Sequence, residues 1–273
     1  MSVPFDIGRF IIYPGRKIYG FLVTSKVKPG VLATISSILS KYNVTILYLS
    51  FSRFITTPTR KVTAIAFCDF TESTVSPENL VKEVEKLEFI EKIEIIKPRI
   101  DGFMSDYKSF PLKIRENRAV IIRDIGYKGL LVGIRKRFGS AAEAFLYYLG
   151  FEAGREYGKD HKKMAKELGI EDPAKIYDII SATMFNSVGY GRMETIKFDS
   201  KKPYALIRVH HSFECELERG VNKPYSHLVR EMIAGVITEL LGKEMHAEEI
   251  KCITKGDPYC EFEVIQKTQI KKS

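Results

Sequence analysis

The sequence predicts an α+β protein built from two domains. Its 273 residues are enough for two domains of ordinary size. In residues 1–98, segments of strand-like alternation are separated by segments of helical periodicity, in the order βαββαβ. The remainder has strand-like segments at both ends of a helical middle. We therefore expect an N-terminal βαββαβ domain, followed by a C-terminal mixed α/β domain with antiparallel strands and a helical layer.

The composition predicts a soluble protein of the cytoplasm. Hydrophobic residues make up 45% of the chain and charged residues 28%, which is ordinary for a globular protein. No segment approaches the roughly 20 apolar residues that span a bilayer, so no membrane association is expected. The first residues lack a basic segment followed by an apolar one, as a signal peptide would have. In a reducing compartment the four cysteines are expected to be thiols or metal ligands.

The positive charge of the chain is spread along its length. The net charge is +9, and residues 1–98 hold 13 Lys/Arg and 9 Asp/Glu, which gives +4 and leaves +5 for the rest. Nucleic-acid binding usually comes with a clustered basic stripe. A solvated surface is the simpler interpretation, and nucleic acid stays an uncertain partner.

Each element of the first domain has a recognisable signal. Lys28-Pro29-Gly30 ends the first strand, and apolar residues then recur at helical spacing from Val31 onward. Ser76-Pro77 opens the second helix, with Ser as the cap and Pro in the first position. A tip at 56–59 is expected to be a hairpin turn. The four predicted strands are 17–27, 45–54, 61–70 and 93–96. This order is the ferredoxin-like plan.

Residues 17–98 also resemble the ACT domain family. The resemblance rests on Pro29-Gly30-Val31-Leu32-Ala33 and on Asn43-Val44-Thr45-Ile46. It implies that residues 1–98 form a regulatory module of a kind that pairs side by side and often binds an amino acid. The loop before the first helix usually carries Asp or Asn where this chain has Val27. The resemblance therefore implies dimerisation, giving a homodimer, ahead of amino-acid binding.

The second domain is expected to begin at residue 118, after a linker at 99–117 that mixes Pro, Gly, Asp and Ser. Residues 118–139 resemble two short strands around Gly126 and Gly129. A helix is expected at 140–158, in which Gly150, Gly154 and Gly158 fall on one face and allow another helix to approach closely. The later predicted helices are 160–168, 173–188 and 226–241, and the later strands are 193–198, 204–215, one containing Met245, and 261–265. Residues 268–273 are expected to be a tail.

Three cysteines and one glutamate are candidates for a metal site. Cys252 and Cys260 are eight residues apart around a Gly-Asp-Pro turn, Glu249 lies three residues before Cys252, and Cys215 lies upstream. Three thiolates and a carboxylate are a plausible tetrahedral zinc set, and a site closed by four protein ligands would be structural. The competing interpretation is a set of buried thiols with a surface carboxylate.

A second resemblance covers residues 118–267. It rests on four motifs: Tyr147-Tyr-Leu-Gly150-Phe-Glu-Ala-Gly154, Gly189-Tyr-Gly191-Arg, Ser212-Phe-Glu-Cys215, and Glu249-x-x-Cys252 with Gly256-Asp-Pro-x-Cys260-Glu-Phe. Together they resemble the 4-vinyl reductase domain, a family that includes the sensor domains of phenol-responsive activators. The resemblance implies zinc ligation by Glu249, Cys252 and Cys260. The family's further cysteine corresponds to Ser226 here. Cys215 is the preferred replacement ligand, and His227 is the alternative.

The resemblances together imply a small-molecule-binding regulatory protein with a zinc staple, and a protein partner is possible. Its ligand would be small and apolar or aromatic. The pocket candidates are Phe145, Tyr148, Phe185, Tyr190 and His210. One alternative is a reductase or accessory factor in tetrapyrrole metabolism, and another is an assembly scaffold without a ligand. The sequence has no nucleophile elbow, phosphate-binding loop or zinc-protease helix, which disfavours the familiar hydrolases and kinases, so whether the protein is an enzyme stays open.

Overall fold

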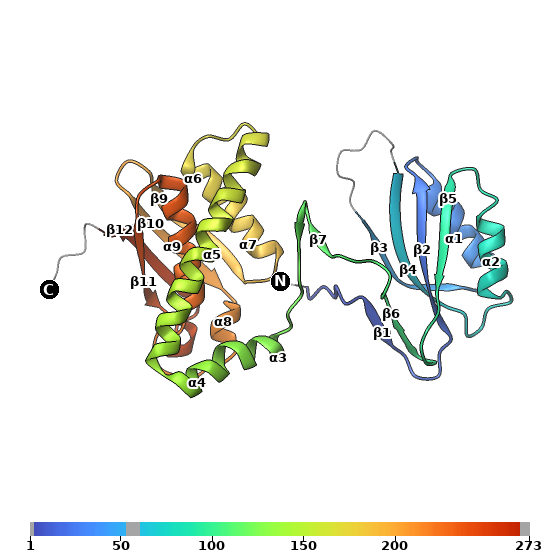
Figure 1. Cartoon of the computed structure of the whole chain (residues 1–273), viewed down its shortest axis with the longest axis horizontal. Helices are drawn as coiled ribbons and strands as arrows, with labels where there is room; N and C mark the ends of the chain where they lie inside the picture. The colour runs from blue at the N-terminus through green and yellow to red at the C-terminus, as the bar shows by residue number, and fades with distance from the viewer. Residues whose placement is uncertain (1–2, 53–60, 268–273) are drawn as a thin grey trace. The chain divides into compact units, whose positions relative to one another are not determined.

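The computed structural model describes residues 3–52 and 61–267. Two compact units divide the chain between Val120 and Ile121 (Figure 1). The predicted boundary at residue 118 lies close to this division. Each unit has its own four-stranded antiparallel sheet and its own buried core.

The first unit contains the predicted strands and helices in the predicted order. They are β2 Ile18–Lys26, α1 Val31–Lys41, β3 Thr45–Phe51, β4 Lys61–Asp69, α2 Pro77–Val84 and β5 Ile90–Ile96. The sheet order is β3-β4-β2-β5, and all of its pairs are antiparallel. The predicted turn at 56–59 lies outside the described residues.

Local signals fix where the two helices of the first unit begin. Gly30 precedes α1 with a φ of 87°, in the left-handed region that glycine adopts without strain. Before α2, the Ser76 side chain accepts a hydrogen bond from the Asn79 backbone N–H at 3.2 Å, as the predicted cap requires. Leu39 of α1 and Leu80 of α2 share one core cluster with Phe21 of β2. Both helices therefore cover the face of the sheet that Phe21 occupies.

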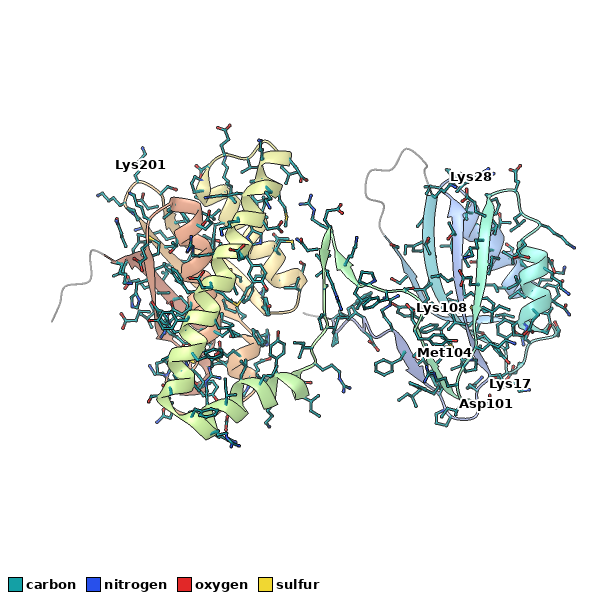
Figure 2. The ribbon with its side chains drawn as sticks, in the orientation of Figure 1. Lys17, Lys28, Asp101, Met104, Lys108 and Lys201 are labelled. Atoms are coloured by element: carbon teal, nitrogen blue, oxygen red, sulfur yellow. The ribbon has the colours of Figure 1, made fainter. Side chains whose placement is uncertain are left out.

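A two-stranded ribbon covers the opposite face of this sheet. It pairs β1 Phe10–Ile12 with β6 Phe103–Ser105. Met104 of β6 is fully buried with Ile18, Phe67 and Ile96 (Figure 2). The range 99–117, expected to be a linker, thus contributes β6 to this core, and it also contains β7 Lys113–Ile114, which pairs with β8 Asn117–Arg118.

The second unit begins with a helical segment where two short strands were expected. The segment consists of α3 Asp124–Tyr127, a π-helical stretch Lys128–Gly133 and α4 Ile134–Phe138. The strand prediction for residues 118–139 is therefore wrong. The apolar residues that decide the structure are Tyr127, Leu131 and Ile134, which are three or four apart and pack in one cluster. That spacing is helical, and the alternation seen at residues 119–125 obscured it.

The glycine face predicted on the next helix is confirmed. Helix α5 spans Ser140–Glu167 as one element of 28 residues, where two helices, 140–158 and 160–168, were expected. Helix α9 spans His227–Leu241 and lies beside α5 (Figure 1). A Cβ atom on Gly154 would lie 2.2 Å from the carbonyl oxygen of Met232, and one on Gly235 would lie 2.2 Å from that of Phe151. The two backbones therefore approach as closely as only glycine allows.

The sheet of the second unit has the order β11-β12-β10-β9, and its pairs are antiparallel. Its strands are β9 Arg192–Asp199, β10 Tyr204–His210, β11 Met245–Lys251 and β12 Cys260–Gln266. Between α5 and β9 the chain forms α6 Pro173–Lys175, a π-helical stretch Ile176–Ala182 and α7 Thr183–Ser187, where one helix at 173–188 was expected. Within the described ranges, no helix is both long enough and apolar enough to cross a bilayer.

The predicted strand 204–215 is wrong at its C-terminal end. Strand β10 stops at His210, because His211 has a φ of 53° and turns the chain. Residues Phe213–Glu216 form a short helix, α8. Cys215 therefore lies on a helical turn, not on a strand, and its side chain is fully buried.

Candidate metal centre

Three neighbouring elements bring four buried side chains together. Cys215 lies on α8, Glu249 on β11, Cys252 directly after β11, and Cys260 at the start of β12. One ligand atom of each, a sulfur or a carboxylate oxygen, lies within 4.8 Å of the others. The Sγ atoms of Cys215 and Cys252 are 3.6 Å apart. This group can hold a metal ion.

A β-bulge allows Glu249 and Cys252 to face the same side. Residues three apart in a regular strand point to opposite faces of the sheet. In β11, Glu249 pairs with Phe262, but the next pair is Lys251 with Glu261, so Ile250 is the extra residue. The bulge adds one residue to the spacing and turns Cys252 toward the same interior as Glu249. Both side chains are buried as a result.

The turn between the two later cysteines is fixed by its own contacts. Residues Ile253–Lys255 form one turn of 3₁₀ helix, and Gly256 ends it with a φ of 97°. The Asp257 carboxylate accepts a hydrogen bond from the Cys252 backbone N–H at 2.8 Å. The Thr254 hydroxyl lies 3.0 Å from the Cys252 sulfur and donates to the backbone carbonyl of Lys223 at 2.6 Å. The Gly-Asp-Pro signal in the sequence therefore marks a turn that orients Cys252.

Ser226 lies in the middle of the group. Its Oγ is 2.9 Å from the Cys215 sulfur, donates to Glu249 Oε1 at 2.9 Å, and is 3.8 Å from the Cys260 sulfur. The other carboxylate oxygen of Glu249 accepts hydrogen bonds from the backbone N–H groups of Tyr225 and Ser226, each at 3.0 Å. The sequence identified Ser226 only as a position without a cysteine and missed that its hydroxyl joins three of the four side chains.

Between the two candidates for the fourth ligand, the geometry places Cys215 in the group. His227 Nδ1 lies 3.4 Å from an Arg135 nitrogen, and its Nε2 lies 3.8 Å from the Glu143 carboxylate. Its burial lowers its pKa to about 4. His227 therefore takes part in a different set of contacts.

The electrostatics of the group favour a bound cation. Burial raises the pKa of the Glu249 carboxyl to about 8. Hydrogen bonding between the two thiols raises the pKa of Cys215 and lowers that of Cys252. Ionisation of one member therefore opposes ionisation of its neighbours, because like charges meet in a site without water. A divalent cation would supply the opposing charge, and thiolates and carboxylates bind metals in the deprotonated form. The donor set thus fits a metal that prefers sulfur with one oxygen.

The five pocket candidates do not form one site. Phe145 and Tyr148 on α5 are 60% and 69% exposed. Phe185 is buried, and its ring lies 5.2 Å from that of Tyr190. His210 lies on the outer face of the sheet, where it contacts the Tyr259 ring at 5.4 Å and the Glu194 carboxylate at 3.4 Å. The structure therefore brings only Phe185 and Tyr190 together, and the ligand role of all five stays a prediction.

The similar proteins include sequences and folds from several sources. Residues 206–266 match the family model of the 4-vinyl reductase domain. Uncharacterized protein MJ0745 of Methanocaldococcus jannaschii is 26% identical over 171 residues, which are 63% of this chain and 81% of that protein. Uncharacterized protein MJ1642 of the same organism is 25% identical over 133 residues, which are 49% of this chain and 70% of that protein.

Among solved structures, the phenol-responsive sensory domain of the transcription activator PoxR is similar with a TM-score of 0.53 and 17% identity. That match covers 58% of this chain and 82% of the sensory domain. A vinyl-4-reductase family protein from Methanocaldococcus jannaschii is similar with a TM-score of 0.37 and 18% identity, over 55% of this chain and 84% of that one. By the family match, the second unit contains a 4-vinyl reductase domain at residues 206–266, and all four clustered side chains lie inside it.

Proposed function

We propose that this chain is a small-molecule-binding regulatory protein whose second unit is held together by a structural zinc ion. The observation that carries the proposal is the buried group of Cys215, Glu249, Cys252 and Cys260 within 4.8 Å. Three sulfur donors and one oxygen donor suit tetrahedral zinc, and four protein ligands leave no open position for catalysis. The family match of residues 206–266 and the fold shared with a phenol-responsive sensory domain support a sensing role, with a small apolar or aromatic molecule as the ligand.

The first unit is assigned, in the same proposal, to regulation and dimerisation. Its sheet order and its two helices on one face support a ferredoxin-like, ACT-like module. The protein would act in the cytoplasm as a homodimer, and ligand binding would favour one arrangement of that dimer. Sedimentation of the purified chain tests this assignment, since a monomer at micromolar concentration would contradict it.

Elemental analysis of untagged protein tests the metal. About one zinc per chain is expected, as one closed four-ligand site requires. The Cys252→Ser variant should lose zinc and melt at a lower temperature. The Cys68→Ser variant is the matched control, because Cys68 is equally buried but lies in the first unit, so it should keep its zinc. Well-folded wild-type protein without any metal would rule out the zinc site.

Binding of simple phenols tests the sensing role. Melting temperatures and native mass spectra should reveal a phenol that stabilises wild-type protein. Tyr190→Phe removes one hydroxyl beside Phe185 and should weaken that stabilisation. Tyr148→Phe, which removes the same group from an exposed side chain, should leave it unchanged. A broad panel of phenols without effect on zinc-loaded protein would contradict the proposed ligand class and leave the metal result intact.

A further inference from the structure

A second buried carboxylate lies directly beside the metal centre. Glu214 precedes Cys215 on α8, and its side chain is fully buried. Its Oε2 accepts hydrogen bonds from the backbone N–H groups of Leu228 at 3.0 Å and Val229 at 2.9 Å, in the first turn of α9. A carboxylate at a helix N-terminus is favourable, but a buried one also needs a cation.

Arg135 of α4 supplies that cation. It is 8% exposed, and its Nη2 forms an ion pair and hydrogen bond with Glu214. The same nitrogen donates to the backbone carbonyl of Tyr225 at 3.0 Å. The guanidinium lies 4.0 Å from the centre of the Tyr225 ring, a cation–π contact. One side chain of α4 thus holds both α8 and the residue before Ser226.

The loop that enters α9 is therefore held from two sides. Glu249, a proposed metal ligand, binds the N–H groups of Tyr225 and Ser226. Glu214 binds the N–H groups two and three residues further on, and Arg135 joins Glu214 to the carbonyl of Tyr225. Because Cys215 is covalently adjacent to Glu214, a movement of either residue displaces the other. The metal ligands and Arg135 consequently share one set of backbone groups.

We propose that Arg135 is a positioning residue of the metal centre, and that metal binding and the docking of helical segment 124–138 stabilise each other. This inference rests on the zinc site proposed above. With zinc bound, the four deprotonated ligands keep an excess of two negative charges, and Glu214 adds one more. Arg135 is the cation that faces this group from α4, where the surroundings screen charge poorly. By thermodynamic linkage, whatever Arg135 contributes to metal affinity, the metal contributes equally to docking of the segment.

The segment is suited to report the state of the metal. Its buried anchors are Leu131, Val132 and Arg135, whereas Ile125 and Phe138 are 69% and 58% exposed. Gly139 ends it with φ 54° and ψ −130°, a backbone conformation that favours glycine. A short helical segment with few buried anchors belongs to the less stable parts of a fold. Loss of the metal should therefore loosen 124–138 before it unfolds the sheet.

Competition with a chromophoric chelator measures the metal term. Partners that orient metal ligands change affinity about 10- to 100-fold when they are lost. We expect Arg135→Met to weaken zinc binding by such a factor and Arg135→Lys, which keeps the charge without the planar fork, to weaken it less. Arg137→Met is the matched control, since Arg137 lies on the same helix but is exposed, and it should bind zinc as the wild type does. A folded Arg135→Met variant with wild-type zinc affinity would overturn the proposal.

Hydrogen exchange of the full chain, with and without zinc, measures the docking term. Backbone amides of 124–138 in wild-type protein should exchange faster after zinc removal, while amides of strands β2 to β5 in the first unit should not change. If Arg135→Met does not fold, this wild-type comparison decides alone: exchange in 124–138 that ignores zinc refutes the linkage. Wild-type protein that binds no zinc at all refutes the proposed metal site instead, so the two failures can be told apart.

Discussion

Replacing Gly154 by alanine would force the two long helices of the second unit apart. The new Cβ would lie 2.2 Å from the Met232 carbonyl oxygen and 2.9 Å from the Met232 Cα. Real Cβ contacts are longer than 3.0 Å, so α5 and α9 must separate by about 1 Å. Overpacking of a well-packed core costs typically about 1–3 kcal/mol, and here the obstacle is backbone, which cannot rotate away. Alanine returns up to about 1 kcal/mol as a better helix former, which leaves a net loss of about 2 kcal/mol.

Thermal unfolding followed by circular dichroism measures this loss. For a unit of this size, about 2 kcal/mol lowers the melting temperature by roughly 4–8 °C. Gly129→Ala is the matched control, because Gly129 is also helical but has no atom within 4 Å of the place where the new Cβ would lie. That variant should melt at the wild-type temperature or slightly above it. A Gly154→Ala variant as stable as Gly129→Ala would refute the close approach of the helices.

Three further outcomes are expected. Burial raises the pKa of Glu231 from 4.5 to about 7, so the native state holds a proton that the unfolded chain releases, and wild-type stability should fall as pH rises from 4.5 to 7. Denaturation of Glu231→Gln should lack this slope and give a gain of about 2 kcal/mol at pH 8; equal slopes would contradict it. Ser76→Ala should cost the first unit about 1 kcal/mol in calorimetry, whereas alanine at the exposed Ser40 should cost little. Free zinc at about 100 times its Kd should stabilise the second unit by about 2.7 kcal/mol, and a melting curve that ignores zinc would contradict that.

The first unit was largely predictable, because its signals are local. Each strand alternates, each helix has its spacing, and Gly30 and Ser76 mark the two helix starts. The ribbon of β1 and β6 was missed. Its strands have three residues each and pair across 93 positions, as between Phe10 and Phe103, so neither carries a period that can be read alone. The burial of Met104 exists only once that pairing forms.

The second unit was harder to predict, because distant contacts decide its local structure. The glycine face of α5 could be read from spacing alone, since three glycines four apart leave room for a backbone. The segment 124–138 could not, because its helical form depends on packing against Leu146 and Leu228. The end of β10 was missed because His211 adopts a left-handed backbone, which nothing in its own side chain requires.

The four metal-site candidates could be named from the sequence, and the contacts that orient them could not. Spacing indicated Glu249, Cys252 and Cys260, and the geometry joined Cys215 to them. The role of Ser226 and the Arg135–Glu214 pair depend on residues that meet from three separate elements. The pocket candidates were chosen from apolar helix faces, which do not distinguish an exposed Phe145 from a buried Phe185.

The extra residue in β11 makes the length of the motif as important as its chemistry. Because Ile250 is the inserted position between two paired neighbours, it acts as a spacer that sets the phase of everything after it. Deleting it would restore a regular ladder and rotate Cys252 to the solvent face, with every ligand type unchanged. Substitutions at Ile250, which is 42% exposed, should in contrast be tolerated. In related chains we therefore expect variation in the identity of this residue, but not in the count of residues between the glutamate and the cysteine.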